Sequence, residues 1–413
     1  MSLNDLPAAS DGDPGHRPGP AQARTTVVLR SASERQSHPW IFRRTVKQVS
    51  GEPRDGDEVL VTSSAGFPIG RGFWHGRSNI AVRLISHDPD QALDEHFLRE
   101  RLARAVALRR DLLGLERRTD AYRVVHSEGD GLSGLVVDRY ASLVVLEFYS
   151  AGFFRRRELL RELFIELFGD VRVVFKVASV ASDREGLPAD IDEDSGSLGD
   201  VETEITENKM RFLVRPTGHK TGFFLDQREN RERWAGLVRG AKVLDAFAYT
   251  GGFAIAARTL GRAREVVAVD LDEEAVEQGR RNARLNRADI DWRHEDAFRF
   301  LRNHRHAVER FDAISVDPPK WATDRRDLET AGRRYIDVNT YAIEALRPGG
   351  LLVSSSCSGL ISPEAFLGFL RRAAERAGRE LQLVHFGGAA GDHPVAIHCP
   401  ETRYLKVAFA RVL

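Results

Sequence analysis

The sequence predicts an α/β protein in which a mostly parallel β-sheet fills the second half of the chain, after two smaller units. Beyond about residue 208, apolar strand-like runs, turns and helical stretches alternate in "AKVLDAFAYTGGFAIAARTL", "EVVAVDLDEEAVEQGRRNARLN", "FDAISVDPPK" and "GGLLVSSSCS". This alternation implies right-handed crossovers and a sheet covered on both faces. From Thr25 to about His87 the text is instead strand-like and punctuated by glycine, as in "DEVLVTSS" and "AVRLIS". A length of 413 residues also exceeds the usual single core, so two or three domains are expected.

The middle of the chain mixes helical and strand-like segments. Apolar positions recur at helical spacing in "LDEHFLRERLARAVALRRDLL" and again in "FRRRELLRELFIELF" at residues 154 to 168. Two strand candidates flank the turn in "YRVVHSEGDGLSGLVVDRYASLVVLEFY". The acidic, glycine-rich stretch from Ser182 to about Asn208 is the best linker candidate.

These segments predict four parts of the chain. We expect a disordered tail at residues 1–24, a small β-rich domain at 25–89, an α+β connecting domain at 90–190 and an α/β domain at 191–413. The tail is rich in Pro, Gly and Ala and lacks an apolar segment of the secretory kind.

The composition excludes several classes of protein. With 61 basic and 61 acidic residues the formal charge is zero, so any surface for RNA must be a local patch. Two cysteines exclude a disulfide framework, and no cluster of Cys and His shows metal-ligand spacing, so we expect a reducing cytoplasm and no metal. No apolar run reaches about 18 residues, the length that spans a bilayer.

A nucleoside cofactor is expected where the first strands of the α/β domain end. Asp245 ends the first strand, Gly251 and Gly252 open the next helix, and Asp270 ends the second strand, where a carboxylate can accept from both ribose hydroxyls. A G-x-G-x-x-G loop for a pyrophosphate is absent, which favours S-adenosylmethionine over a dinucleotide. The alternative is that both aspartates are ordinary turn formers.

Other residues of these loops complete the predicted cofactor site. Asp296, after the third strand, could accept from the adenine amino group, and the alternative reading is a helix N-cap. The loops also contribute Phe247, Tyr249, Thr250 and Leu271.

A reactive centre is expected at the next two strand ends. The fourth strand ends in "VDPPKW", where two prolines fix the backbone beside Asp317, and the fifth ends at Cys357. Adjacent strands lie about 5 Å apart, so both side chains can face one pocket. Addition of the thiolate to C6 of a pyrimidine would make C5 enamine-like, able to attack a methyl sulfonium. Asp317 is the candidate that stabilises a cytosine adduct near N3.

The thiol must lose its proton for this chemistry. We therefore expect its pKa to be lowered from about 8.5 by neighbours such as Lys320. The alternative is that Cys357 is a small buried hydrophobe, as free cysteine often is. Cys399, the other cysteine, is expected to be structural.

These motifs resemble one family, the bacterial large-subunit (23S) ribosomal RNA cytosine-C5 methyltransferases with an N-terminal PUA-like domain. The resemblance covers residues 25 to 413 and rests on "HPWIF", "GDGLSGLVVDRY", "KTGFFLDQRENR", "DPPK", "SCSGL", "DHPV" and "YLK". It implies a PUA-like domain, a connecting domain, a Rossmann-like class I methyltransferase domain that uses S-adenosylmethionine, and a homodimer.

The resemblance also implies roles for particular residues. The Cys of "SCSGL", Cys357, would be the nucleophile, and the motif before the sheet would help to bind the cofactor through Gln227 and Arg228. An arginine there can pair with the methionine carboxylate, unless it lies on a solvated helix start. Related RNA cytosine methyltransferases have a second Cys after the Pro of the fourth-strand motif, where this chain has Lys320, so the role of that Cys is either absent here or performed by another group.

The β-rich domain carries a candidate RNA-binding cluster. Its cations suit phosphates and its rings suit bases, although each residue alone fits a solvated face or a core. The cluster consists of Arg43, Arg44, Arg71, Phe73, Trp74 and Arg77.

Three alternative functions remain open at this stage. Methylation of uracil at C5 would use the same thiol. An inert RNA-binding protein would not need Cys357, and a nicotinamide-dependent dehydrogenase is disfavoured by the missing phosphate loop.

Overall fold

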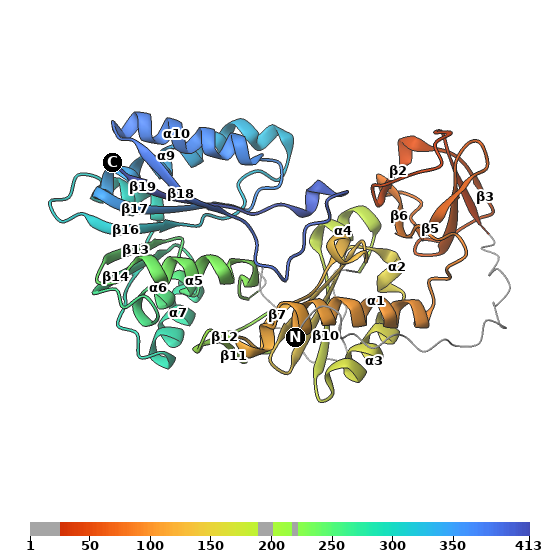
Figure 1. Ribbon diagram of the computed structural model, residues 1–413, viewed down its shortest axis with the longest axis horizontal. Helices are drawn as coiled ribbons and strands as arrows, with labels where there is room; N and C mark the ends of the chain where they lie inside the picture. Colours follow the sequence, from red (N-terminus) through yellow and green to blue (C-terminus); the bar gives the residue numbers. More distant parts are fainter. Residues whose placement is uncertain (1–24, 189–200, 217–221) are drawn as a thin grey trace, which may run out of the picture.

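A computed structural model describes residues 25–188, 201–216 and 222–413 of the chain (Figure 1). The predicted tail, residues 1–24, lies outside the described residues, as does the centre of the predicted linker, residues 189–200. None of the helices in the described ranges combines the length and the apolar character that a bilayer crossing requires.

The N-terminal unit is a six-stranded sheet in the order β2-β6-β5-β4-β1-β3. Its neighbours pair antiparallel except β1 with β4. Alternating side chains point into one apolar core, for example Val59 and Val61 of β4. The elements are β1 Thr26–Leu29, β2 Trp40–Phe42, η1 Arg43–Thr45, β3 Val46–Ser50, β4 Glu58–Thr62, β5 Pro68–Trp74 and β6 Ile80–Ser86.

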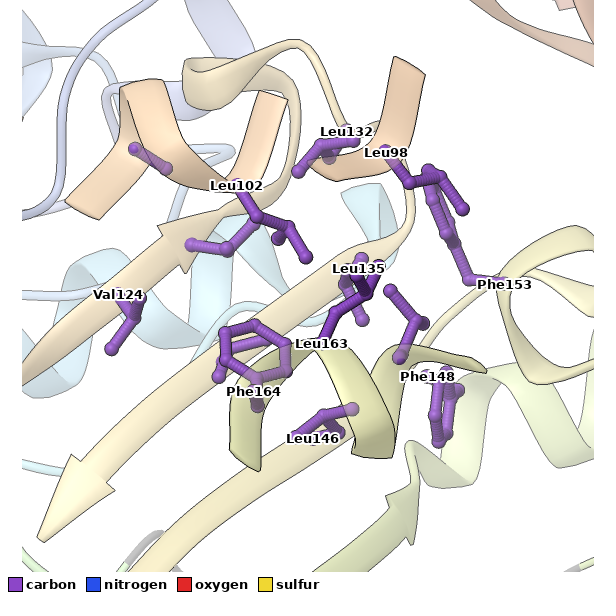
Figure 2. Close-up of a cluster of buried hydrophobic side chains, with 14 of the residues drawn as sticks. Leu98, Leu102, Val124, Leu132, Leu135, Leu146, Phe148, Phe153, Leu163 and Phe164 are labelled. Atoms are coloured by element: carbon purple, nitrogen blue, oxygen red, sulfur yellow. The ribbon is translucent and has the colours of Figure 1, made fainter. Parts of the chain in front are cut away.

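The central unit packs helices on a four-stranded sheet in the order β10-β9-β8-β7. Figure 2 shows Leu98 and Leu102 of α1 above the sheet, with Leu163 and Phe164 of α3 in the same apolar cluster. The Asp94 carboxylate accepts from the amide of Phe97 at 3.0 Å and caps α1, which explains why the helix begins there. The helical elements are α1 Glu95–Ala107, η2 Leu108–Leu112, η3 Leu115–Arg117, η4 Ser127–Asp130, α2 Ala151–Phe154, α3 Arg157–Phe168 and α4 Ser179–Glu185.

The strands of this unit are β7 Ala121–His126, β8 Leu135–Tyr140, β9 Leu143–Phe148 and β10 Arg172–Val177. The expected two strands around the glycine turn are β7 and β8, and a third, β9, follows at once. The linker prediction is wrong at both ends. Ser182 belongs to α4, and an antiparallel hairpin of β11 Thr203–Glu207 and β12 Met210–Val214 begins before residue 208.

The C-terminal unit confirms the predicted α/β fold. Seven strands form one sheet in the order β15-β14-β13-β16-β17-β19-β18, in which β19 pairs antiparallel with both neighbours and the other pairs are parallel. The strands are β13 Lys242–Ala246, β14 Glu265–Asp270, β15 Asp291–His294, β16 Phe311–Val316, β17 Leu346–Ser356, β18 Leu381–Gly387 and β19 Lys406–Val412.

Helices cover both faces of this sheet (Figure 1). The helices α5, α6 and α7 pack on one face, and α8, α9 and α10 share a separate apolar cluster on the other. The helical elements are η6 Leu225–Gln227, α5 Arg228–Leu237, α6 Gly252–Thr259, α7 Glu273–Leu285, α8 Ala297–His304, η7 Arg325–Asp327, α9 Leu328–Ala345, α10 Pro363–Ala377 and η8 Pro400–Thr402.

The strand order indicates where a ligand would bind. The chain moves outward from β13 to β14 and β15, and then returns to the other side of β13 as β16 and β17. Crevices for ligands form where the order reverses, at the carboxyl ends of these strands. The division of the chain at residues 89 and 190 into domains stays our proposal.

Candidate active site

A cavity of about 1240 Å³ opens at the carboxyl ends of β13, β14, β16 and β17. The loops after these strands line most of it, and the central unit closes one side with Glu147, Tyr149 and Lys176. Most residues predicted for the cofactor and the reaction lie on its wall. They are Gln227, Phe247, Tyr249, Thr250, Gly252, Asp270, Leu271, Asp296, Asp317, Lys320 and Cys357.

The loop after β13 is held in an unusual conformation beside the cavity. Phe247 and Tyr249 have positive φ angles of 64° and 49° although neither is glycine. The Asp270 carboxylate fixes the loop, because its Oδ2 accepts from the amide of Tyr249 at 2.7 Å and its Oδ1 accepts from the amide of Asp272 at 2.9 Å. Strained backbone held in this way is common at ligand sites.

Two predicted cofactor residues lie behind this loop, outside the cavity wall. Asp245 is buried and accepts from the amide of Ala254 at 2.8 Å and from the hydroxyl of Ser315 at 2.6 Å, so it anchors α6. Burial raises its pKa to about 7. Gly251 has φ +89° and a Cβ there would meet the ring of Trp292 at 2.8 Å. We therefore correct the prediction that Asp245 and Gly251 line the cofactor site. Both residues instead position the loop after β13.

A nucleoside fits the region between β14 and α8. The carboxylate of Asp270 lines the cavity, and the apolar side chain of Leu271 is 65% exposed beside it. A flat base would cover Leu271, and Asp270 stands where ribose hydroxyls are recognised. Asp296 caps α8 by accepting from the amide of Arg299 at 2.7 Å, so the N-cap reading is correct, and the same residue lines the cavity.

The predicted place of Arg228 in the cofactor site is corrected, because its side chain does not line the cavity. Its side chain is fully buried, with Nη1 at 3.0 Å from Oδ2 of Asp392 and Nε at 3.5 Å from Glu207. Asp392 belongs to the "DHPV" motif and also accepts from the amide of Arg123 in the central unit at 2.9 Å. Arg228 therefore joins two units of the chain, whereas Arg231, one turn further along α5, lines the cavity.

The two predicted reactive side chains, those of Asp317 and Cys357, line the same cavity. Cys357 follows the last residue of β17, Asp317 follows β16, and these strands pair in parallel. Gln227 donates to Oδ2 of Asp317 at 3.0 Å, and Asn230 holds the Gln227 amide through a 2.8 Å bond to its oxygen. Burial and the nearby charge of Asp226 raise the pKa of Asp317 to about 7, against the lowering effect of its hydrogen bonds with Gln227 and Ser355.

The expected lowering of the thiol pKa is wrong. Burial, together with the negative charges of Asp317 and Asp226, raises the pKa of Cys357 to about 12. Lys320 opposes this increase, as predicted, but it is outweighed. The thiol is half-buried: it packs against the apolar cluster beneath α5, α6 and α7, in line with the alternative of a small buried hydrophobe, and it also lines the cavity.

Two ionisable groups near the thiol were missed in the sequence. Lys406 faces Ser356 across the β17–β19 pair and donates to the carbonyl oxygens of Ser358 at 2.7 Å and Tyr404 at 2.8 Å. Burial lowers its pKa to about 8, while the nearby Cys357 thiolate opposes that decrease. Asp226, which lines the cavity, is the second. Both stand in recognised motifs, "YLK" and "KTGFFLDQRENR", which was the available signal.

The candidate RNA cluster is only partly on the surface. Arg71 is buried and bonds Glu58 at 2.8 Å, and Phe73 is buried against Phe153 with ring centroids 5.2 Å apart. Trp74 is also buried, under the guanidinium of Arg43 at 5.3 Å.

We therefore correct the prediction that Arg71, Phe73 and Trp74 contact RNA, because their side chains are buried in the fold. Arg44 and Arg77 are exposed, and Arg43 is half-buried with a 3.0 Å bond to the carbonyl of Ser78. Cys399 is fully buried, consistent with its expected structural role.

Comparison with known proteins places this geometry among methyltransferases. A family profile of S-adenosylmethionine-dependent methyltransferases matches residues 193–394, and a PUA-like domain profile matches residues 30–87. "Ribosomal RNA large subunit methyltransferase I" of Aeromonas salmonicida is 38% identical over 388 residues, covering 92% of this chain and 96% of the relative. The protein of the same name from Shewanella amazonensis is 37% identical over 387 residues, covering 93% and 97%.

Solved structures share the fold at lower identity. One of them is a Streptococcus mutans protein described as a "putative sam-dependent methyltransferase". It is 19% identical to this chain, with a TM-score of 0.76, and the match covers 94% of this chain and 99% of that one. The methyltransferase SMU.776, solved in complex with SAH, is 19% identical with a TM-score of 0.75 over the same shares of the two chains.

Proposed function

This chain belongs to the ribosomal RNA large subunit methyltransferase I family, and we propose that it methylates C5 of a cytosine in large-subunit (23S) ribosomal RNA through a covalent adduct with Cys357. It is an S-adenosylmethionine-dependent enzyme with a PUA-like domain before a Rossmann-like methyltransferase domain. The nicotinamide-dependent and inert alternatives are thereby set aside.

The cofactor would lie along β13 and β14, where it supplies a methyl group on a sulfonium. Asp270 would hold the ribose, Asp296 the adenine and Leu271 one face of the base. Gln227 lies between this region and Asp317, to which it donates. Arg231, the last residue of the motif "KTGFFLDQRENR", lies on the cavity wall, whereas Arg228 does not.

The reaction begins with the sulfur of Cys357. Its thiolate would add to C6 of the cytosine while protonated Asp317 donates to N3, which removes negative charge from the ring as the adduct forms. The pKa of Asp317 is about 7, so its carboxyl group is protonated in about half of the protein molecules at neutral pH. Proton retention on Asp317 also removes one of the two charges that oppose thiolate formation.

Two lysines favour the thiolate form. Lys320 lies on the cavity wall, where its charge acts to lower the pKa of Cys357. The charge of the Cys357 thiolate acts to raise the pKa of Lys406. The ammonium group of Lys406 donates hydrogen bonds to two backbone carbonyl oxygens, which hold it in place. Lys320 opposes, but does not outweigh, the burial and the two carboxylates that raise the pKa of Cys357 to about 12.

One observation supports the proposal above the others. The free thiol of Cys357 lines the same cavity as Asp317 and the nucleoside-side residue Asp270. A thiol there has no role in a methyl transfer that proceeds by direct attack, whereas a C5 target needs one.

The proposal is tested by methyl transfer to ribosomal RNA from cells that lack this protein. Tritium from methyl-labelled S-adenosylmethionine should appear as 5-methylcytidine in the digested RNA. Cys357→Ala should bind cofactor and RNA but form no product, whereas Cys399→Ala, the matched control, should retain activity. Product formed by Cys357→Ala would contradict the adduct, and labelled 5-methyluridine would favour the uracil alternative.

Three further features stand as proposals. The exposed Arg44 and Arg77 would contact RNA phosphates from the N-terminal domain. The protein would act in the cytoplasm, where ribosomal RNA is made and free thiols stay reduced. It would also form a homodimer.

A further inference from the structure

After methyl transfer, one step of the proposed reaction has no assigned residue. C5 of the ring then carries both a proton and the new methyl group, and the proton must leave before the thiol can be expelled. We propose, on the basis of the function proposed above, that Asp226 is the general base that accepts the C5 proton.

Asp226 has one carboxylate oxygen that is held by a hydrogen bond and one that has no hydrogen-bond partner among the described residues. It lies in η6, directly before α5, and its backbone oxygen accepts from the amide of Ala390 at 2.8 Å. The Tyr404 hydroxyl donates to its Oδ2 at 2.6 Å. Oδ1 is buried and has no hydrogen-bond partner among the described residues. A buried carboxylate oxygen without a donor is unusual and indicates a binding or catalytic task.

The position of Asp226 relative to the thiol suits this task. It lines the same cavity as Cys357 and Asp317, and its negative charge acts to raise the pKa of both. If sulfur and methyl add to opposite faces of the ring, the C5 proton ends on the same face as the sulfur. A base beside Cys357 is therefore on the correct side.

The other ionisable groups of the cavity are less suited to accept this proton. Asp317 already bonds Gln227 and is assigned to N3, and both oxygens of Asp270 accept from backbone amides. Lys406 donates to two carbonyl oxygens, and Lys320 is a cation when it favours the thiolate. Oδ1 of Asp226, in contrast, is a buried acceptor that has no hydrogen-bond partner among the described residues.

The electrons of the step balance without another reactant. The C5–H bond breaks and its proton passes to Oδ1 of Asp226. The electron pair of that bond forms the C5–C6 double bond, and the C6–S bond breaks with its electrons going to the sulfur of Cys357. The carboxyl group then releases the proton to solvent through the cavity, which restores the carboxylate.

The test uses the full-length enzyme, saturating S-adenosylmethionine and RNA that carries tritium at C5 of cytosine. Asp226→Asn should reduce tritium release by about 100-fold or more, the usual contribution of a general base. The same variant should accumulate a protein–RNA adduct that already contains the methyl group, because addition and transfer precede the blocked step. Formate added to Asp226→Ala should restore part of the tritium release.

Tyr404→Phe is the matched control, since it removes the phenol that holds Oδ2 and keeps the carboxylate. It should slow turnover without accumulating the methylated adduct. Tritium release by Asp226→Asn at the wild-type rate, or its loss with no adduct and no formate rescue, would overturn the role of Asp226. If instead the wild type forms no adduct through Cys357 with 5-fluorocytosine RNA, the proposed function itself fails.

Discussion

The pH dependence of methyl transfer gives a worked prediction for Asp317→Asn. The proposed reaction needs a protonated Asp317 and a thiolate at Cys357, with pKa values of about 7 and about 12. Below pH 7 Asp317 keeps its proton, and the thiolate fraction rises tenfold with each pH unit. Above pH 7 the loss of protonated Asp317 offsets the gain in thiolate, so the rate is expected to level off.

The magnitudes follow from these two values. Between pH 7 and pH 9 the population with both groups in the required form changes by only about twofold. Asp317→Asn removes the titrating acid, so its rate should be lower throughout but should rise by about 100-fold over the same interval. The same substitution removes one of the charges that raise the pKa of Cys357, which shifts its curve toward lower pH.

The assay is kcat/KM for the RNA from pH 5.5 to pH 9, because this parameter reports the groups of the enzyme before RNA binds. Asp317→Glu serves as a control that keeps a titrating carboxyl group. A wild-type rate that keeps rising tenfold per unit above pH 7, or an Asp317→Asn profile that is flat there, would refute the pairing of acid and thiolate.

Three further predictions concern binding and stability. Arg228→Ala leaves the buried Asp392 without its arginine partner, although Glu207 keeps its ion pair with Arg231, so the free energy of unfolding by urea should fall by about 3–5 kcal/mol. Asp270→Ala should weaken S-adenosylmethionine binding by about 100-fold in calorimetry, because it loses both the ribose contact and the support of the β13 loop. Arg44→Ala combined with Arg77→Ala should weaken RNA binding and reduce its salt dependence by about two ions.

Exposed residues provide controls for these variants. Arg326→Ala, whose side chain is 89% exposed, should change stability by less than about 0.5 kcal/mol. Arg376→Ala on α10 should leave RNA binding unchanged. A mild effect of Arg228→Ala would contradict its structural role. Normal cofactor affinity for Asp270→Ala, or an unchanged salt dependence for the arginine pair, would contradict the other two assignments.

The sequence predicted the fold best where local periodicity carries it. The helical spacing in residues 93 to 113 corresponds to α1 and the turn that follows it, and the four alternating segments of the second half correspond to β13, β14, β16 and β17 with their helices. The β11–β12 hairpin was missed because it is short and follows an acidic, glycine-rich stretch. The insertion of β19 between β17 and β18 depends on pairing between distant residues, which periodicity does not reveal.

The site was predictable where it depends on strand ends. Asp270 ends a strand, and Asp317 and Cys357 each follow one; these strands could be identified locally, and the parallel sheet brings the three residues to one cavity. The choice between Arg228 and Arg231 was not predictable, because it depends on which one meets Asp392, a residue more than 160 positions away.

Burial and charge were the hardest to predict. Phe73 is an aromatic residue of the kind that stacks on RNA bases, but Phe153 of the central unit packs against its ring. The thiol pKa likewise depends on Asp226 and on burial, and both come from the folded chain.

Mass spectrometry of a trapped complex tests the central claim most directly. The enzyme, S-adenosylmethionine and RNA with 5-fluorocytosine at the target would be incubated together and digested with nuclease and protease. We predict one modified peptide, with a methylated 5-fluorocytidine nucleotide attached to the sulfur of Cys357. A nucleotide attached to any other residue, or no covalent complex from an enzyme that still methylates ordinary RNA, would contradict the account.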